Sequence, residues 1–358
     1  MFYFFLGVGF VFLFLFFSPN EFHQVPIVLE NWYWSKQQQF GTKGDSRFKS
    51  SDPNKVLNGY KYDGKFFSFE ANQFLNFEEE ILEYPLLGKG FFRYKKIGEY
   101  ITYYSSYGEI LWKKNSHSYP FASFLGNLNF LISGDGNQVL LVDIDGNPTG
   151  ARQLDGRFLT DMAHTVLHGS VILFSGGEIF RLDPSGNIIW KLTNLQTEQK
   201  VLLFYKSIAI SPDGNFVAVH FLKDTKDYIA VLGSKGETLT IFHLPNKYPH
   251  KLYMAVSEKG NVLVNANDVL LMFSVKGEIL HQTIKKKTEK VYHVAFCQEN
   301  IFVADIENTL IFLNSQGYLI RKYPISSLNR RLFSSTQRGQ FFLETEEEII
   351  AFQLFYDK

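Results

Sequence analysis

The sequence predicts an all-β protein in which four-stranded sheets repeat around a ring. Three observations support this prediction: many aromatic residues, short apolar segments separated by glycine turns, and recurrence of these turns about every forty residues. Phe and Tyr number 37 and 19 among 358 residues, and both favour the pleated, half-buried surface of a sheet. With 45% hydrophobic residues, a chain of this length can bury a sizeable core.

Charge and cysteine content restrict the function. Lys and Arg together number 36, as do Asp and Glu, so the formal net charge is zero. Sequence-independent binding of nucleic acid needs a basic field that this composition does not supply, so we expect no nucleic-acid partner. The one cysteine, Cys297, excludes an intrachain disulfide and a cysteine-rich zinc site. We expect Cys297 to be buried on a strand, as free cysteines commonly are.

The chain begins with an apolar run at residues 2–17, which ends at Ser18 and Pro19. As a helix this run would span about 24 Å at ~1.5 Å per residue, and its position is typical of a signal sequence. No Lys or Arg precedes it, and no small-residue cleavage pattern follows it. We assign residues 1–20 to a signal peptide or membrane anchor and favour retention of residues 1–18 as an anchor. The protein is then exported, to the periplasm or the extracellular space.

A polar and irregular stretch follows, and we assign residues 21–60 to a tether. It contains an aromatic motif that consists of Asn31, Trp32, Tyr33 and Trp34. This motif either docks on the following domain or lies at a lipid interface, where Trp and Tyr are enriched. The sequence leaves both alternatives open.

Residues 61–358 repeat a strand, a small polar turn with glycine, and a second strand. The turn glycines are Gly108, Gly146, Gly186, Gly236, Gly277 and Gly317. They are spaced 38, 40, 50, 41 and 40 residues apart, a period typical of the four-stranded blades of a β-propeller. Glycine adopts the positive φ that such hairpin turns require, and Asp, Asn or Ser supports them through side-chain hydrogen bonds. The interval of 50 residues leaves room for an enlarged loop, for which residues 223–227 are one place.

The last apolar segment, residues 348–355, leaves the final blade without its outer strand. Residues 62–69 have the same turn and strand pattern, and we expect them to complete this blade and close the ring. Six covalent repeats and one composite repeat give seven blades. Six or eight are the alternatives, because residues 74–96 are hard to assign. The predicted fold is a single β-propeller of four-stranded blades, with an N-terminal hydrophobic helix and a tether.

The repeats resemble those of the broad quinoprotein-like, NHL-like and WD40-like propeller superfamily. Residues 299–305 and 308–312, with Gly317, are similar to an NHL repeat, and residues 183–190 are similar to a quinoprotein-like turn. The resemblance covers residues 60–358. Absence of Trp-Asp and Gly-His pairs counts against a standard WD40 protein, and a single Gly-Gly pair counts against kelch. Alcohol-oxidising quinoproteins have adjacent cysteines near the cofactor, so a chain with one cysteine predicts no such cofactor.

Two segments offer candidate ligands for a metal. Asp161, His164 and His168 are close in sequence, but Asp161 and His164 would point to opposite faces of a strand. The two histidines would share a face, and such a pair alone makes a weak metal site. Residues 143–147 resemble the start of a calcium loop, yet the twelfth position is Leu154 rather than Glu, which favours a hairpin turn. We assign no metal, cofactor-binding or catalytic residue.

Function follows from these absences and from the repeats. Motifs of nucleophile elbows, phosphate loops and zinc proteases are absent from the sequence. Charge runs at residues 78–80, 285–287 and 346–348 are expected to be solvated loops, with partner docking as the alternative. The sequence favours a non-catalytic scaffold of an envelope assembly, with protein partners on the propeller faces. The alternative is a funnel-type enzyme or small-ligand binder for a sugar, lactone or quinone-related compound, which acids and histidines converging on the central axis would favour.

Overall fold

A computed structural model describes residues 27–36, 56–76, 80–95, 99–195, 203–266, 268–285, 295–306, 308–325 and 331–355. The predicted hydrophobic helix lies outside these residues. Within them, all regular elements are β-strands, and no helix could cross a membrane.

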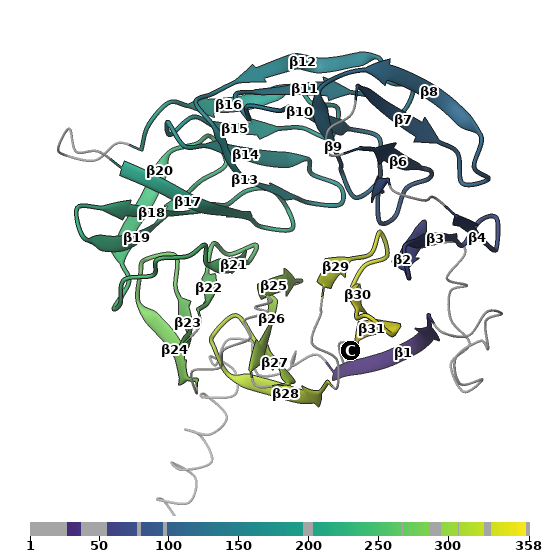
Figure 1. Ribbon diagram of the computed structural model, residues 1–358. Helices are drawn as coiled ribbons and strands as arrows, with labels where there is room; N and C mark the ends of the chain where they lie inside the picture. Colours follow the sequence, from purple (N-terminus) through teal and green to yellow (C-terminus); the bar gives the residue numbers. More distant parts are fainter. Residues whose placement is uncertain are drawn as a thin grey trace, which may run out of the picture.

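The strands form eight antiparallel sheets that follow one another around a ring (Figure 1). Six sheets contain four consecutive strands each. The second and third blades comprise β5 (Ile81–Glu83), β6 (Phe91–Tyr94), β7 (Tyr100–Tyr104), β8 (Ile110–Asn115), β9 (Ser118–Ala122), β10 (Asn129–Ser133), β11 (Gln138–Val142) and β12 (Pro148–Asp155). The fourth and fifth comprise β13 (Leu159–His164), β14 (Ser170–Phe174), β15 (Ile179–Leu182), β16 (Ile188–Leu192), β17 (Leu203–Ile210), β18 (Val217–Lys223), β19 (Lys226–Leu232) and β20 (Thr238–His243). The sixth and seventh comprise β21 (Tyr253–Val256), β22 (Val262–Asn265), β23 (Val269–Phe273), β24 (Ile279–Ile284), β25 (Ala295–Gln298), β26 (Ile301–Ile306), β27 (Thr309–Leu313) and β28 (Leu319–Pro324).

The first and last blades differ from this pattern. In the described residues the first blade has three strands, β2 (Gly59–Tyr62), β3 (Lys65–Ser68) and β4 (Gln73–Asn76). The last blade combines β29 (Arg331–Ser334), β30 (Gln340–Glu344) and β31 (Glu348–Phe355) with β1 (Ile27–Ser35). The first strand of a complete blade is innermost, as the serial contacts among β13, β17, β21, β25 and β29 show.

The prediction of repeated glycine turns is confirmed. All six glycines have φ between 78° and 87°, and their turns join the third and fourth strands of a blade. In the turn of the seventh blade, Gly317 N–H donates to the carbonyl of Asn314 at 3.0 Å. The Asn314 Oδ1 accepts backbone N–H groups from Gln316 and Tyr318 at 3.0 and 2.9 Å. The polar side chain thus supports the turn as the sequence predicts.

The blade count is eight, so the expected seven is wrong. Residues 62–69 belong to β2 and β3, and these strands form a sheet of their own instead of completing the last blade. The proposed loop enlargement at residues 223–227 is also wrong. There, β18 and β19 are long strands that pair as far as Lys223 and Lys226, so the turn between them is short.

Strand β1 closes the ring from within the stretch that we assigned to the tether. It pairs antiparallel with β31, from Ile27 opposite Phe355 to Ser35 opposite Glu348. In Figure 1 the purple strand β1 lies beside the yellow strand β31. Trp32 and Trp34 on β1 are 7% and 8% exposed. The aromatic motif therefore docks on the domain, which is the first of its two alternatives.

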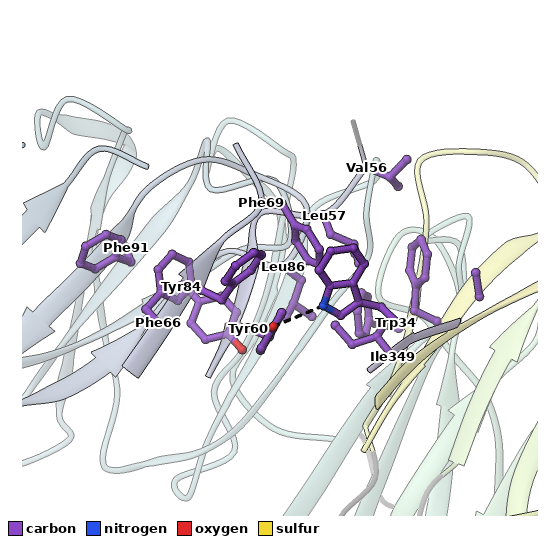
Figure 2. Packing of buried hydrophobic residues seen from close by; sticks show 14 of the residues in the cluster. Trp34, Val56, Leu57, Tyr60, Phe66, Phe69, Tyr84, Leu86, Phe91 and Ile349 are labelled. Atoms are coloured by element: carbon purple, nitrogen blue, oxygen red, sulfur yellow. Dashed lines mark hydrogen bonds between the residues drawn. The ribbon is translucent and has the colours of Figure 1, made fainter. Parts of the chain in front are cut away.

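An aromatic cluster fills the junction between the last blade and the first two (Figure 2). The ring of Trp34 lies 5.1 Å from that of Phe69 and 6.0 Å from that of Phe67, measured between centroids. Its Nε1 donates to the hydroxyl of Tyr60 at 3.3 Å. Burial of these large aromatic side chains stabilises the packing of β1 against the ring.

Candidate functional site

A cavity of about 1120 Å³ lies at one end of the central channel. It is lined by the ends of β13, β17, β21, β25 and β29 and by the turns that follow them. Residues of the Gly317 turn and the last two residues of β31 complete its rim. Turns from first to second strand and from third to fourth strand share one end of an antiparallel blade. We call this side of the ring, with the cavity and the six glycine turns, the mouth face.

The cavity has apolar and polar side chains in its wall and charged side chains at its rim. Ala209, Met254, Ala255, Phe296 and Phe333 contribute to the wall. The charged side chains at the rim are Asp213, Glu258, Lys259, Glu299 and Arg338, together with His168. A concave site with an apolar wall and a few polar groups is the usual form of a binding pocket.

Three rim carboxylates come from three consecutive blades. Burial raises the pKa of Glu258, and the nearby carboxylates of Asp213 and Glu299 raise it further, whereas Arg338 and His168 lower it less. The Oδ1 of Asp213 accepts the Ser211 hydroxyl at 2.5 Å. Glu299 Oε1 accepts Arg338 Nε at 3.0 Å. Glu258 thus lies close to the negative charges of Asp213 and Glu299.

The sequence analysis missed these carboxylates, although a signal was present. Asp213, Glu258 and Glu299 are spaced 45 and 41 residues apart, close to the repeat period. Each lies in the turn that follows the innermost strand of its blade, so these three turns converge on the channel. A search for acids in the turns after innermost strands would have found them.

The structure separates the three residues considered for a metal. Asp161 Oδ1 pairs with Lys251 Nζ at 2.5 Å, and its Oδ2 accepts the Ile208 N–H at 2.9 Å. Strand β13 ends at His164, so His168 lies in the following turn rather than on a shared strand face. In the described part of the chain, no three His, Cys, Asp or Glu side chains are arranged to hold a metal ion.

His164 is packed among aromatic rings. Its ring is 5.1 Å from those of Phe121 and Phe130, and its Nδ1 lies 2.7 Å from the Ser170 hydroxyl. The buried Nε2 has no hydrogen-bond partner among the described residues. Burial lowers the pKa of His164 to about 4, so its imidazole is neutral at pH 7.

Ser207, His220 and Asp227 have the order of a Ser-His-Asp relay, but they lie inside the fifth blade. His220 Nε2 is 2.8 Å from Asp227 Oδ1, whereas His220 Nδ1 is 3.5 Å from the Ser207 hydroxyl. Their exposed fractions are 1% for Ser207 and 0% for the other two. A nucleophile must reach its substrate. This triad therefore joins strands, with Lys206 also contacting Asp227 at 2.5 Å.

Several smaller predictions have clear outcomes. Cys297 is buried on β25, and burial raises the pKa of its thiol. Residues 143–147 form the predicted hairpin turn, in which Asn147 N–H donates to Asp143 Oδ1 at 2.7 Å.

The expectation of a solvated Lys285 is wrong, because its side chain is buried and its Nζ donates to Asn265 Oδ1. Lys286 and Lys287 lie outside the described residues.

The other two charge runs differ in outcome, and Glu348 of the run at residues 346–348 is a half-buried residue at the start of β31 rather than part of a loop. Glu346 and Glu347 are exposed, as predicted. The Glu347 carbonyl nevertheless accepts the backbone N–H of Lys36 at 2.7 Å, which fixes the end of β1 on this turn. Glu80 pairs with Arg93, and residues 78 and 79 lie outside the described residues.

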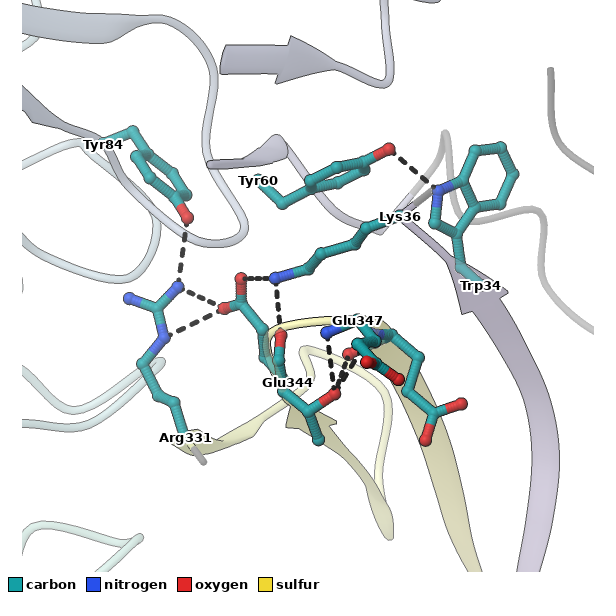
Figure 3. A network of polar contacts seen from close by, with 9 residues as sticks. Trp34, Lys36, Tyr60, Tyr84, Arg331, Glu344 and Glu347 are labelled. Atoms are coloured by element: carbon teal, nitrogen blue, oxygen red, sulfur yellow. Dashed lines mark hydrogen bonds and ion pairs between the residues drawn. The ribbon is translucent and has the colours of Figure 1, made fainter. Parts of the chain in front are cut away.

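A second polar network joins β1, the last blade and the second blade (Figure 3). Lys36 Nζ donates to Glu344 Oε1 and to the Thr345 carbonyl, both at 2.7 Å. Burial lowers the pKa of Lys36, although Glu344 acts in the opposite direction. Arg331 pairs with Glu344 and donates to the Tyr84 hydroxyl at 3.2 Å. These polar groups pair with one another at the junction where β1 and the last blade close the ring, so we assign them a structural role.

Neither a protein-family model nor a curated protein matches the sequence. Among solved structures, the fold is similar to BamB from Moraxella catarrhalis, with 12% identity and a TM-score of 0.56 over 93% of this chain and 99% of that one. It is also similar to Hsv2 from Kluyveromyces marxianus, with 9% identity and a TM-score of 0.50 over 73% of this chain and 92% of that one. Identities this low show the fold alone. The chain is a β-propeller, so the propeller fold that the resemblance of its repeats implies is confirmed.

Proposed function

We propose that this propeller is an exported scaffold that binds a protein partner through its mouth face. The observation that supports the proposal is the cavity of about 1120 Å³ on that face, which the turns of five blades line. A rigid ring holds these turns in fixed positions, so binding requires little ordering of the site. The described residues that resemble catalytic groups, Ser207 and His220, are buried inside a blade.

The apolar run at residues 2–17 supports export and membrane tethering as part of this proposal. Strand β1 begins opposite Phe355, which is a cavity-lining residue. The first residue of β1 therefore lies at the mouth face. Anchoring through residues 1–18 would hold this face toward the membrane, and the partner would be a component of the same envelope assembly.

A small-ligand site is the second candidate, because acids and His168 do converge on the channel mouth. The cavity is large enough for a sugar or a similar compound. Native mass spectrometry of the purified protein separates the two candidates. A stoichiometric small molecule that is lost on partial unfolding would favour the ligand site over the scaffold.

The scaffold is tested by mild crosslinking in native cells, followed by purification of the full-length protein and mass spectrometry of its companions. Leu167→Arg changes an exposed, apolar cavity-lining residue on the mouth face. Phe204→Arg is the matched control, because Phe204 is equally exposed and lies at the opposite end of an inner strand. We expect one companion at near-equal amounts with the wild type and Phe204→Arg, and its loss with Leu167→Arg. Recovery of the propeller without any companion would overturn the proposal.

A further inference from the structure

We propose that the partner of the mouth face is a basic, amphipathic protein segment, with Lys or Arg side chains over the rim and apolar side chains on the cavity wall. This inference rests on the proposed function and specifies the chemistry of the partner. Two independent observations support it. The described turns of the mouth face carry more carboxylates than cations, and apolar side chains are exposed at equivalent positions on the same face.

The turns of the mouth face are acidic although the whole chain is neutral. Among the described residues, ten carboxylates lie in these turns: Glu70, Glu109, Asp143, Asp145, Asp183, Asp213, Glu237, Glu258, Glu278 and Glu299. Five cations of the same described turns accompany them: Lys89, Lys235, Lys259, Lys276 and Arg338. Ten against five leaves a formal charge of minus five on these turns. Two strand cations, Lys114 and Arg181, also donate to carbonyls of these turns and offset part of this charge. Such a field attracts basic partners and raises their rate of association.

Two of these cations, Lys259 and Arg338, belong to the cavity rim, whereas Lys89 does not. Lys89 pairs with Glu70 at 2.7 Å in the turns of the first two blades. Arg338 pairs with Glu299, and both belong to the rim. The carboxylates of Asp213 and Glu258 remain close enough for Asp213 to raise the pKa of Glu258. A guanidinium or ammonium group from a partner would relieve this repulsion.

Exposed apolar side chains recur beside these acids. Four outer strands begin, just after their glycine turn, with Ile110, Ile188, Ile279 and Leu319, which are 61%, 43%, 56% and 50% exposed. Leu167 at the cavity is 55% exposed. Large apolar side chains repeated on one face indicate an interaction surface. Acids between them disfavour an anionic lipid surface, because like charges repel.

The probe for this proposal is a fluorescent peptide of eight residues with alternating Lys and Leu, compared with the same peptide carrying Glu in place of Lys. We expect the Lys peptide to bind the full-length protein and the Glu peptide to bind at least tenfold more weakly. Affinity for the Lys peptide should fall as salt rises, because the rim is exposed to solvent. Equal binding of the two peptides would overturn the proposal.

Matched variants locate the binding. The triple variant Glu109→Gln, Asp145→Asn and Glu258→Gln removes three exposed carboxylates from the mouth face. The control Asp63→Asn, Glu99→Gln and Asp224→Asn removes three exposed carboxylates from turns of the opposite face. We expect about tenfold weaker binding for the first and less than twofold for the second. Equal losses in the two would show a general charge effect and contradict a site at the mouth.

Two outcomes distinguish this inference from the proposed function. If Leu167→Arg abolishes the crosslinked companion while the Lys and Glu peptides bind alike, the scaffold stands and the basic partner is wrong. If the Lys peptide binds at the mouth but no companion is recovered from cells, the scaffold is wrong. Vesicles of phosphatidylglycerol serve as a further probe, which tests whether the mouth face binds lipid. Binding to them that is unaffected by the Lys peptide would assign the face to lipid and overturn the proposal.

Discussion

Tyr84 of the second blade accepts a hydrogen bond from Arg331 of the last blade at 3.2 Å, across the place where the first blade has no inner strand in the described residues. This hydroxyl thus joins the second blade to a cation of the last blade. Because Tyr84 is 7% exposed, water cannot readily take over this role.

Replacement of Tyr84 by Phe should therefore weaken the ring at this seam. The change removes the hydroxyl and leaves Arg331 with one partner fewer, which should lower the free energy of unfolding by about 1–3 kcal/mol. Tyr107→Phe is the control, because Tyr107 is 57% exposed. Denaturant unfolding of both variants measures the difference, and equal stability of the two would contradict the role of Tyr84.

Trp34→Ala should destabilise the protein by about 3–5 kcal/mol, because it leaves a cavity among Tyr60, Phe67 and Phe69. Tyr33→Ala on the same strand removes a side chain that is 46% exposed, and we expect a change within about 0.5 kcal/mol. Thermal unfolding distinguishes them. Similar melting temperatures would show that β1 contributes little to the closure of the ring.

Stability should fall between pH 6.5 and pH 4 because of His164. Its pKa of about 4 in the folded protein lies below the value near 6.5 of the unfolded chain. Above pH 6.5 both states are neutral. Below it the unfolded state binds a proton that the folded state does not, so unfolding is favoured as pH falls. The loss should approach about 3 kcal/mol at pH 4.

His164→Phe should remove this part of the pH dependence, although the Ser170 hydroxyl then loses its partner and stability at pH 7 is lower. The measurement is the free energy of unfolding at pH 7 and pH 4 for the two proteins. An unchanged difference between the two pH values would mean that His164 is not held neutral by burial.

Gly317→Ala tests the turn geometry. Gly317 has φ of +85°, and an added Cβ would lie 2.7 Å from the carbonyl oxygen of Leu280 in the neighbouring blade. Gly64 has φ of +70° but open space around an added Cβ. We expect Gly64→Ala to lower the free energy of unfolding by about 1 kcal/mol because of its φ alone. Gly317→Ala should lower it by more. Equal costs would show that the blades separate easily at this contact.

Cys297 should react slowly with N-ethylmaleimide in the folded protein and rapidly after denaturation. Burial limits access and raises the pKa of the thiol, so little of the reactive thiolate is present. The rate of labelling, followed by mass spectrometry, gives the protection factor. Fast labelling under native conditions would show that the Cys297 thiol is accessible from the cavity that β25 lines.

Local features of the fold were predictable from the sequence, whereas its long-range pairing was not. A turn such as that at Gly317 is encoded within five residues, because glycine allows the positive φ and Asn314 supplies the hydrogen bonds. Closure of the ring by Trp34 opposite Ile349 depends on a pairing across most of the chain. Residues 62–69 have an equally suitable local pattern, so the pattern alone could not decide between the two closing strands.

The mouth was harder to predict than the blades. Asp213, Glu258 and Glu299 lie in different repeats, and each alone looks like an ordinary turn acid. Only the ring brings them to one rim. The buried Lys285 shows the converse. Its place in a basic run predicts exposure to solvent, whereas Asn265 at the end of β22 accepts a hydrogen bond from its ammonium group. In both cases tertiary packing determines the outcome.

Pairing of β1 with β31 also sets an order of events during synthesis. Trp34 leaves the ribosome about 300 residues before Ile349, its partner in the last sheet. At roughly 5–20 residues per second, β1 must wait tens of seconds for the strand that it will cover. During this time its two tryptophans have no native partner on β31 or β30. Nascent chains of this protein should therefore be substrates for chaperones that bind exposed aromatic segments until synthesis is complete.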